Sequence, residues 1–452
     1  MSRAAETAAR VSPTRLLRRS RVRWRVFTLL AGLGAVAYFQ QKEVTIAAEQ
    51  IMPQLSLSQM QIGWLQWAFV LGYTPTQILA GRVGEIFGAR RTLTAACVIA
   101  LAATIALPLA PRLLTGSALF AGMLLSQLLL GIAQSPTFPV GAGVVRAWLP
   151  VRRWAFASGV QSSALQLGAA ATPPVIVLLM QRVGWQQALL WSAVPMLGVI
   201  VLWAWDARDM PRDHPGVNRS ELELIGTSES APVQPLAGTF RVLLRRDVLV
   251  LTFSYLSMNY VYYLLANWSF LYLVQERHLG VARSGWLAAL PPLGAALGAG
   301  LGGAAADALA ARYGARWGYR LIPLLSLPVV AVLLVVAVFH ADALVAVSLL
   351  TLCYALIELN EGPFWAATMR TAGARTMTAT GFLNTGGAAG GLLGIPVVAY
   401  LSGHGAWTAA FGLGSLCAFG SALGWLVIDC EARGESTAPR GSHSVRSGTD
   451  SR

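Results

Sequence analysis

The sequence predicts an all-α membrane protein with twelve transmembrane helices in two six-helix bundles. Apolar residues make up 55% of the 452-residue chain and charged residues 12%, with a mean hydropathy of +0.57, whereas soluble domains carry about 25% charged residues. Most apolar runs exceed the roughly 17 residues of a short spanning helix, and they lack the period-two alternation of a membrane β-barrel. One long polar interruption, residues 206–246, divides the runs into two sets of six.

The first set follows a basic segment, residues 1–23, which contains seven arginines and no apolar run. Because Arg and Lys accumulate on the cytoplasmic side of membranes, this segment is predicted to be a cytoplasmic tail. No cleavage-like site closes the first apolar run, so a signal peptide is not expected. The spans of an N-terminal bundle over residues 24–205 are predicted near 24–48, 60–81, 92–110, 117–147, 154–181 and 186–205.

The second set begins after a predicted cytoplasmic linker loop at 206–246. Six further apolar runs predict a C-terminal bundle over residues 247–428, in which Asp307 follows the second run as Glu85 does in the first set. The tail at 429–452 is rich in Ser, Gly and Arg, so a disordered cytoplasmic tail is expected there. The spans of this half are predicted near 247–274, 284–312, 321–339, 344–369, 379–402 and 407–428.

The net charge of +14 is concentrated in the short loops between apolar runs. That distribution sets membrane orientation and argues against a nucleic-acid partner. We expect a multi-pass protein of the cell inner (plasma) membrane with both termini cytoplasmic, a monomer in the lipid bilayer. The Arg residues of the predicted cytoplasmic side include Arg82, Arg152, Arg208, Arg246, Arg316 and Arg370.

Chemistry other than transport has little support in the sequence. The four cysteines are scattered singly, with no metal or disulfide spacing. The five histidines are not paired with a plausible nucleophile, and no phosphate-binding loop is present. The sequence therefore predicts neither an enzyme nor a bound metal or cofactor.

A tight polar turn joins the second and third spans, in the stretch FVLGYTPTQILAGRVGEIFGARR at residues 69–91. Close glycine spacing lets membrane helices approach each other. The turn resembles the loop between helices 2 and 3 of the major facilitator superfamily, roughly Gly-x-Leu-Ala-Asp-Arg-x-Gly-x-Arg-Arg, with Glu85 in place of the Asp. A plain positively charged loop is the alternative. The resemblance implies that residues of this turn take part in gating. The candidate gating residues are Gly81, Glu85, Gly88, Arg90 and Arg91, together with Asp307 at the corresponding place in the second half.

Longer stretches are similar to the anion:cation symporter branch of that superfamily, which includes permeases for galactonate, glucarate, hexuronate and phthalate and relatives of the vesicular glutamate transporters. Residues 131–159 resemble its helix 4 signature, Gly-x-x-Glu-Ala-Pro-x-Phe-Pro, and residues 381–396 resemble its helix 11 run, Gly-Phe-x-Asn-Thr. The resemblance implies proton-coupled secondary transport of a small organic anion, such as a sugar acid or carboxylate, by alternating access between two bundles.

The charged positions of this branch are amides in this chain. Helix 1 of the branch carries Tyr-x-Asp-Arg where this sequence reads Tyr38-Phe39-Gln40-Gln41, and the Arg and Glu positions of helix 4 hold Gln127 and Gln134. Removing both members of a buried charge pair costs less than removing one, and glutamine cannot titrate. All four glutamines and Tyr38 are candidate substrate-binding residues, while the charge of the substrate and the coupling stay open.

Ionisable residues within spans are costly and usually face a cavity. Lys42 is the only lysine of the protein and could meet an anion. Glu43, Glu358 and Glu361 could take up a proton, and Glu358 and Glu361 share one helical face. The alternatives are a local ion pair between Lys42 and Glu43, and a structural hydrogen bond from Glu361 to a neighbouring helix.

Other candidates for substrate binding are polar or aromatic. Four occupy positions where the resemblance implies substrate contact, namely Tyr73, Gln166, Trp365 and Asn384. Five recur with helical spacing on the seventh span, namely Asn259, Tyr260, Tyr263, Asn267 and Trp268. The aromatic members could instead only pack the bundle.

Two alternative functions stay open. The protein could be a uniporter or exporter of a neutral or zwitterionic solute, although the helix 5 stretch LGAAATPPV lacks the Gly-Pro-x-x-Gly-Gly of drug antiporters. It could also be a transporter-like sensor that binds a solute without moving it.

Overall fold

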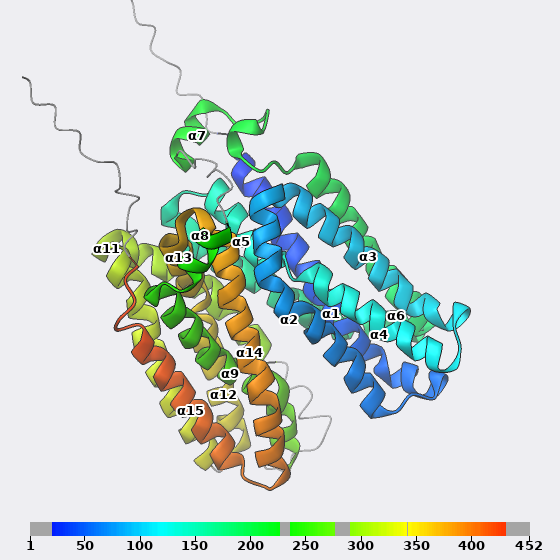
Figure 1. Ribbon diagram of the computed structural model, residues 1–452. Coiled ribbons are helices and arrows are strands. Elements are labelled where there is room, and N and C mark those ends of the chain that lie inside the picture. Colours follow the sequence, from blue (N-terminus) through cyan, green and yellow to red (C-terminus); the bar gives the residue numbers. More distant parts are fainter. Residues whose placement is uncertain (1–19, 227–235, 276–289, 341, 431–452) are drawn as a thin grey trace, which may run out of the picture.

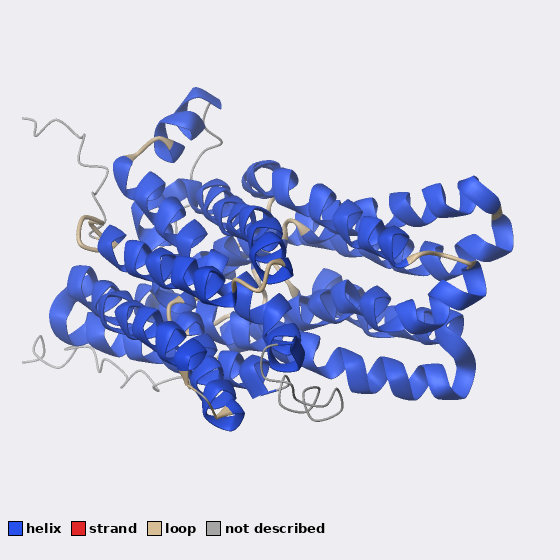
Figure 2. Cartoon of the chain, turned by 90° about the horizontal axis from the view of Figure 1, so that it is seen from below, coloured by secondary structure: helices blue, strands red, loops and turns tan. Residues whose placement is uncertain are grey.

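The computed structural model describes residues 20–226, 236–275, 290–340 and 342–430. Within these ranges every regular element is a helix, and none is a strand (Figure 2). The predicted cytoplasmic tails fall almost entirely outside the described ranges, as do the middle of the linker loop and the start of the eighth predicted span.

The N-terminal half is built from six helices. The fourth predicted span is broken at Ser135 and Pro136, between α4 and α5. The fifth and sixth predicted spans both lie in α6, whose chain turns at Gly184 with φ at 76°, a conformation that glycine adopts without steric cost. The bounds are α1 (Val22–Leu55), α2 (Gln59–Phe87), α3 (Ala89–Leu113), α4 (Gly116–Gln134), α5 (Thr137–Trp148) and α6 (Trp154–Asp206).

The C-terminal half repeats these features. Its fourth span is broken at Leu359 and Asn360, between α12 and α13, and its long helix α11 turns at Gly314 with φ at 79°. The predicted linker loop contains two short helices, α7 (Arg219–Ile225) and α8 (Leu236–Leu243). The bounds in this half are α9 (Arg246–Gln275), α11 (Leu290–Phe339), α12 (Ala343–Glu358), α13 (Glu361–Ala372), α14 (Thr376–Gly403) and α15 (Trp407–Gly424).

Eight stretches of the described chain are long and apolar enough to cross a membrane. Three of them turn back, at Gly184, at Gly314 and at the 3-10 turn Gly373–Arg375, so each makes two passes. Helix α2, which carries four glutamines, is the remaining span of the predicted twelve. The chain therefore has the all-α membrane fold that the sequence predicts.

The two halves come together at one end of the molecule, near α5, α8 and α13 (Figure 1). There Arg90 donates to the Ala204 carbonyl, Arg320 to the Ile428 carbonyl and Arg370 to the Cys430 carbonyl. We call this the arginine-rich end; it comprises Arg25, Arg82, Arg90, Arg153, Arg208, Arg245, Arg320, Arg370 and Arg375.

Glycines set the distance between the halves at this end. A side chain at Gly81 of α2 would overlap the Met377 carbonyl of α14, and one at Gly303 of α11 would overlap the Ala155 carbonyl of α6. Both pairs bring two helix backbones into direct contact, which only glycine permits at these positions.

Hydrogen bonds repeat the same pairing. Ser163 Oγ donates to the Ala296 carbonyl at 2.6 Å, and Thr385 Oγ1 donates to the Thr74 carbonyl at 3.3 Å. Ser163 in the α6–α11 interface corresponds to Thr385 in the α2–α14 interface, and Ala296 corresponds to Thr74. The two residues of each corresponding pair are the same number of residues apart in the sequence. Two copies of one helix interface therefore close the arginine-rich end.

Candidate functional site

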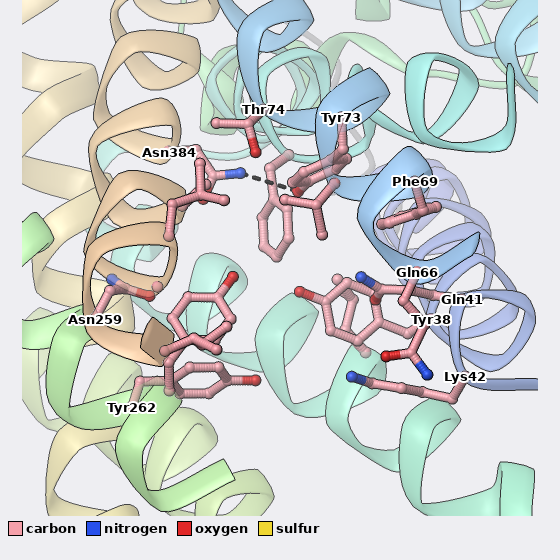
Figure 3. A pocket seen from close by; sticks show the side chains of 18 of the residues that line it. Tyr38, Gln41, Lys42, Gln66, Phe69, Tyr73, Thr74, Asn259, Tyr262 and Asn384 are labelled. Atoms are coloured by element: carbon pink, nitrogen blue, oxygen red, sulfur yellow. Dashed lines mark hydrogen bonds between the residues drawn. The ribbon is translucent and has the colours of Figure 1, made fainter. Parts of the chain in front are cut away.

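A cavity of about 530 Å³ lies between the two bundles (Figure 3). Its walls come from α1, α2, α4, α5 and α6 of the first half and from α9, α12, α13 and α14 of the second. The predicted site residues that line it are Tyr38, Gln41, Lys42, Tyr73, Gln127, Gln166, Tyr263, Glu358, Glu361 and Asn384.

One face of α1 supplies the first wall. Tyr38, Gln41, Lys42 and Thr45 recur at helical spacing and all line the cavity. Lys42 is exposed there, and in the described part of the chain it makes no ion pair with Glu43 or any other acid. The proposed local pair of Lys42 and Glu43 is therefore wrong, because the two side chains leave the helix on different faces.

Three predicted site residues of this half lie outside the cavity. Gln40 and Glu43 are buried on the other face of α1, at 0% and 2% exposure, and Gln134 donates through Nε2 to the Ala37 carbonyl at 3.0 Å. The helical rotation of about 100° per residue separates Gln40 from its neighbour Gln41. None of the three faces lipid, but Gln40 and Gln134 do not line the cavity as substrate ligands would.

The two carboxylates of the second half are held by hydrogen bonds. Glu358 accepts from Ser162 Oγ at 3.1 Å and from Gln166 Nε2 at 3.2 Å, and both donors belong to α6 of the opposite bundle. Glu361 accepts from Tyr255 Oη at 3.0 Å and from Trp365 Nε1 at 2.7 Å. Glu358 therefore bridges the halves, whereas Glu361 is held within its own.

Trp365 acts from outside the cavity. Its ring stacks on Phe138 of α5, with ring centroids 5.2 Å apart and an interplanar angle of 13°. It is 3% exposed and does not line the cavity, so its predicted role in substrate contact is not supported. It positions Glu361 instead.

Helix α9 presents part of the predicted face, because Asn259 and Tyr263 were both predicted there. Tyr255, Asn259, Tyr262 and Tyr263 line the cavity. Tyr260, predicted as a substrate ligand, packs instead beside the glycines of α14. The side chains of Asn267 and Trp268 lie outside the described residues.

An amide link faces the carboxylate link across the cavity. Asn384 of α14 donates to Tyr73 Oη at 3.1 Å and also to Gln77 Oε1, both on α2. Asn384 occupies the position in α14 that Ser162 occupies in α6, at the interval that relates the two interfaces. One interface thus carries a titratable link between the halves and the other an uncharged one.

Two acids join the bundles at the arginine-rich end. Glu85 accepts from the Thr378 backbone N–H at 2.9 Å and pairs with Arg375 at 3.2 Å. Asp307 accepts from the Phe156 backbone N–H at 2.8 Å. Each carboxylate lies at the N-terminus of a helix of the other bundle, where the helix dipole favours an anion.

Of the other candidate gating residues, one lies in the interface between the bundles and three do not. Gly81 lies in the closing interface described above. Gly88 ends α2 with φ at 85°, and Arg90 contacts Ala204 and Asp209, so both act within their own bundle. Arg91 is exposed and makes no contact across the halves in the described structure. Neither arginine spans the closing interface.

A sequence profile of the Major Facilitator Superfamily matches residues 30–377. The chain belongs to this superfamily. Its members are transporters rather than enzymes.

Curated relatives from the superfamily carry organic anions. The chain is 29% identical to the probable sulfoacetate transporter SauU of Cupriavidus necator over 390 residues, which are 85% of this chain and 88% of that protein. It is 24% identical to the probable galactarate/D-glucarate transporter GudP of Escherichia coli, over 61% of this chain and 63% of the relative. It is 27% identical to the hexuronate transporter of Bacillus subtilis, over 59% and 60%. These are transporters of the anion:cation symporter type, which confirms the resemblance.

Solved structures of the superfamily share the fold. The transporter FucP in the outward conformation matches with a TM-score of 0.70 at 15% identity, over 90% of this chain and 100% of that chain. The proton:xylose symporter XylE matches with a TM-score of 0.72 at 14% identity, over 90% and 97%. The predicted major facilitator fold with two six-helix bundles is confirmed.

Several cavity residues escaped sequence reasoning. The family resemblance suggested no role for Tyr255, Tyr262 or Ser162, which line the cavity. The sequence pattern could have identified Tyr255, because it precedes Asn259 by one helical turn and so shares a helical face with it. No signal identified Ser162, because its role depends on Glu358 approaching from the other bundle.

Proposed function

We propose that the protein is a secondary active transporter that takes up a small organic anion across the inner membrane together with protons, by alternating access. The observation that carries the proposal is the cavity between the bundles, which combines Lys42 with two hydrogen-bonded carboxylates. In this proposal the protein acts as a monomer in the bilayer, with the substrate and protons as its partners.

The orientation follows from charge. Positively charged loops remain in the cytoplasm, so the arginine-rich end is assigned to the cytoplasmic side, with both termini there. That end is closed by Gly81, Gly303, Glu85 and Asp307, while the cavity reaches Gly63 and Trp67 near the other end of α2. The conformation is then outward-facing, ready to accept a solute from outside.

Lys42 is assigned to the substrate. An ammonium group that lines a cavity and has no acidic partner attracts an anion, and a charge-assisted hydrogen bond there contributes more than a neutral one. The amides Gln41 and Gln127 beside it supply further donors. They stand where the resemblance places charged residues, so Lys42 replaces the missing arginine.

Glu358 and Glu361 are assigned to the coupling proton. Both already accept hydrogen bonds from protein donors, which leaves less capacity for a cationic group of a zwitterionic substrate. Glu358 also bonds the opposite bundle through Ser162 and Gln166. A proton bound at Glu358 therefore changes a contact that must break when the bundles rock, which links titration to the conformational change.

Glu43 is the third predicted coupling residue. It is buried away from the cavity, and its Oε2 atom has no partner among the described residues. Because it touches neither the cavity nor the interface between the bundles, we assign it a minor part in coupling.

Uptake by purified protein in liposomes tests the proposal. A panel containing sulfoacetate, glucarate, glucuronate, benzoate and neutral sugars is applied with an inward proton gradient. We expect an anion to accumulate and accumulation to stop when a protonophore collapses the gradient. Binding without flux would identify a sensor, and gradient-independent movement of a neutral solute would identify a uniporter; either result would contradict the proposal.

A further inference from the structure

The proposed function leaves the chemical class of the anion open, and the lining of the cavity narrows it. Lys42 is the only cation among the described lining residues, and the same lining contains Glu358 and Glu361. A substrate with one anionic group can pair with Lys42. A second anionic group would lie among described lining residues that include two acids and no second cation, and an unpaired buried charge is costly.

Aromatic rings cover both walls of the cavity. Figure 3 shows Lys42 extending from the α1 wall into the space that faces Tyr262 of the other bundle. Aromatic rings offer large apolar surfaces and prefer offset-stacked or edge-to-face contacts with another ring. The aromatic lining residues are Tyr38, Trp67, Phe69, Tyr73 and Phe138 on one side and Tyr255, Tyr262 and Tyr263 on the other.

Neighbouring rings hold these walls in place. Phe69 and Tyr73 stack with centroids 5.7 Å apart and an interplanar angle of 15°. Tyr262 meets Tyr263 edge-to-face at 5.2 Å. Since these contacts already fix the rings, a planar substrate would bind without first ordering them, and preorganisation of this kind increases affinity.

Resting on the proposed transport function, we propose that the substrate is an aromatic monoanion. Its single carboxylate or sulfonate pairs with Lys42 Nζ, and its ring lies between the Tyr38 and Tyr262 walls. A cavity of about 530 Å³ accommodates a substituted benzene ring, since cavities of about 300 to 1,000 Å³ hold drug-sized ligands. Dianions and polyhydroxylated acids are the disfavoured classes.

The test is a binding panel on the full-length purified protein, measured by calorimetry. Benzoate and phenylacetate are compared with the dianion phthalate, with benzamide as the uncharged match of benzoate. Glucuronate and glucarate form the corresponding hydroxylated pair of monoanion and dianion. We expect benzoate or phenylacetate to bind at least tenfold more tightly than phthalate, benzamide and both sugar acids.

Two variants test separately the ammonium group and the aromatic wall of the proposed site. Lys42→Gln should reduce benzoate affinity to that of benzamide, and Tyr262→Leu should weaken both aromatic ligands at least fivefold. The controls are Arg112→Gln, an exposed cation outside the cavity, and Tyr400→Leu, an exposed tyrosine at 67% exposure. Both controls should leave every affinity unchanged.

The other outcomes separate this inference from the proposed function. Equal or tighter binding of phthalate or glucarate, or a preference for glucuronate over both aromatic acids, would overturn the aromatic monoanion and leave anion transport standing. Benzamide binding as tightly as benzoate and unaffected by Lys42→Gln would overturn both proposals. So would the absence of binding by every anion in a panel on correctly folded protein.

Discussion

At the scale of single residues, the positive charge of the cavity comes from one bundle and the carboxylates come from the other. Lys42 comes from the first bundle and is exposed to the cavity, while Glu358 and Glu361 come from the second and are held by hydrogen bonds. In the family pattern charged residues occupy helices 1 and 4. Here those positions are glutamines, and only Gln41 and Gln127 among them line the cavity.

The first prediction concerns Lys42. Lys42→Gln removes the charge and leaves an N–H donor on a shorter side chain, so it should weaken substrate binding at least tenfold, because hydrogen bonds to charged groups contribute about 1.5–3 kcal/mol. The measurement is the binding constant of the transported solute, with an unchanged melting temperature as evidence of folding. An unaltered binding constant would remove Lys42 from the site.

The second prediction concerns Glu361. Glu361→Gln keeps an acceptor for Tyr255 and Trp365 but cannot exchange a proton. Wild-type protein should accumulate substrate about tenfold for each unit of inward pH difference if one proton is coupled. The variant should lose this accumulation and keep counterflow exchange, both measured in liposomes. Retained accumulation would exclude Glu361 as the coupling residue, and Glu358→Gln should then be tried in its place.

At the scale of helices, two matched contacts control how closely the bundles approach. At Gly81 and at Gly303 a backbone carbonyl of the opposite bundle lies so close that it would overlap an added Cβ. The same interval along the chain relates these contacts, the Ser163 and Thr385 hydrogen bonds and the two capping acids. A repeated sequence therefore builds one interface twice.

The third prediction follows from this contact. Gly81→Ala and Gly303→Ala should each prevent full closure of the arginine-rich end and reduce transport at least about tenfold, since overpacking of a close interface costs about 1–3 kcal/mol. Gly198→Ala is the matched control, because no atom lies within 4 Å of the added Cβ. Initial uptake rates measure the effect. Normal rates in both interface variants would show that closure tolerates the extra methyl group.

At the scale of the whole molecule, charges at helix ends join the two bundles at the arginine-rich end. Glu85 and Asp307 each bind the N-terminus of a helix in the opposite bundle. Such interactions contribute about 0.3–2 kcal/mol each. Two of them, together with the glycine contacts, stabilise the closed arginine-rich end.

The fourth prediction concerns the balance between states. Glu85→Gln and Asp307→Asn should each shift the population toward opening of the arginine-rich end by about fivefold, since about 1 kcal/mol changes a two-state ratio by that factor. Thr380→Cys, buried between the cavity and this end, reports opening by its rate of maleimide labelling. Equal labelling rates with and without the acid substitutions would show that these acids do not hold the closed state.

The sequence by itself determined the membrane class, the twelve spans, the division into two halves and the acids at the closing interface. The lengths of the apolar runs and the positions of the arginines indicate the spans and their orientation from local sequence alone. Each capping acid belongs to a recognisable motif. It also identified Lys42, Glu358 and Glu361 as charges at membrane depth.

The tertiary structure decided which side chains share the cavity. Rotation about each helix axis places Gln41 in the cavity and Gln40 outside it, and turns Tyr263 inward and Tyr260 toward α14. The link from Ser162 to Glu358 joins residues of different bundles. Such choices depend on how helices pack against one another, which no local pattern in a uniformly apolar span records.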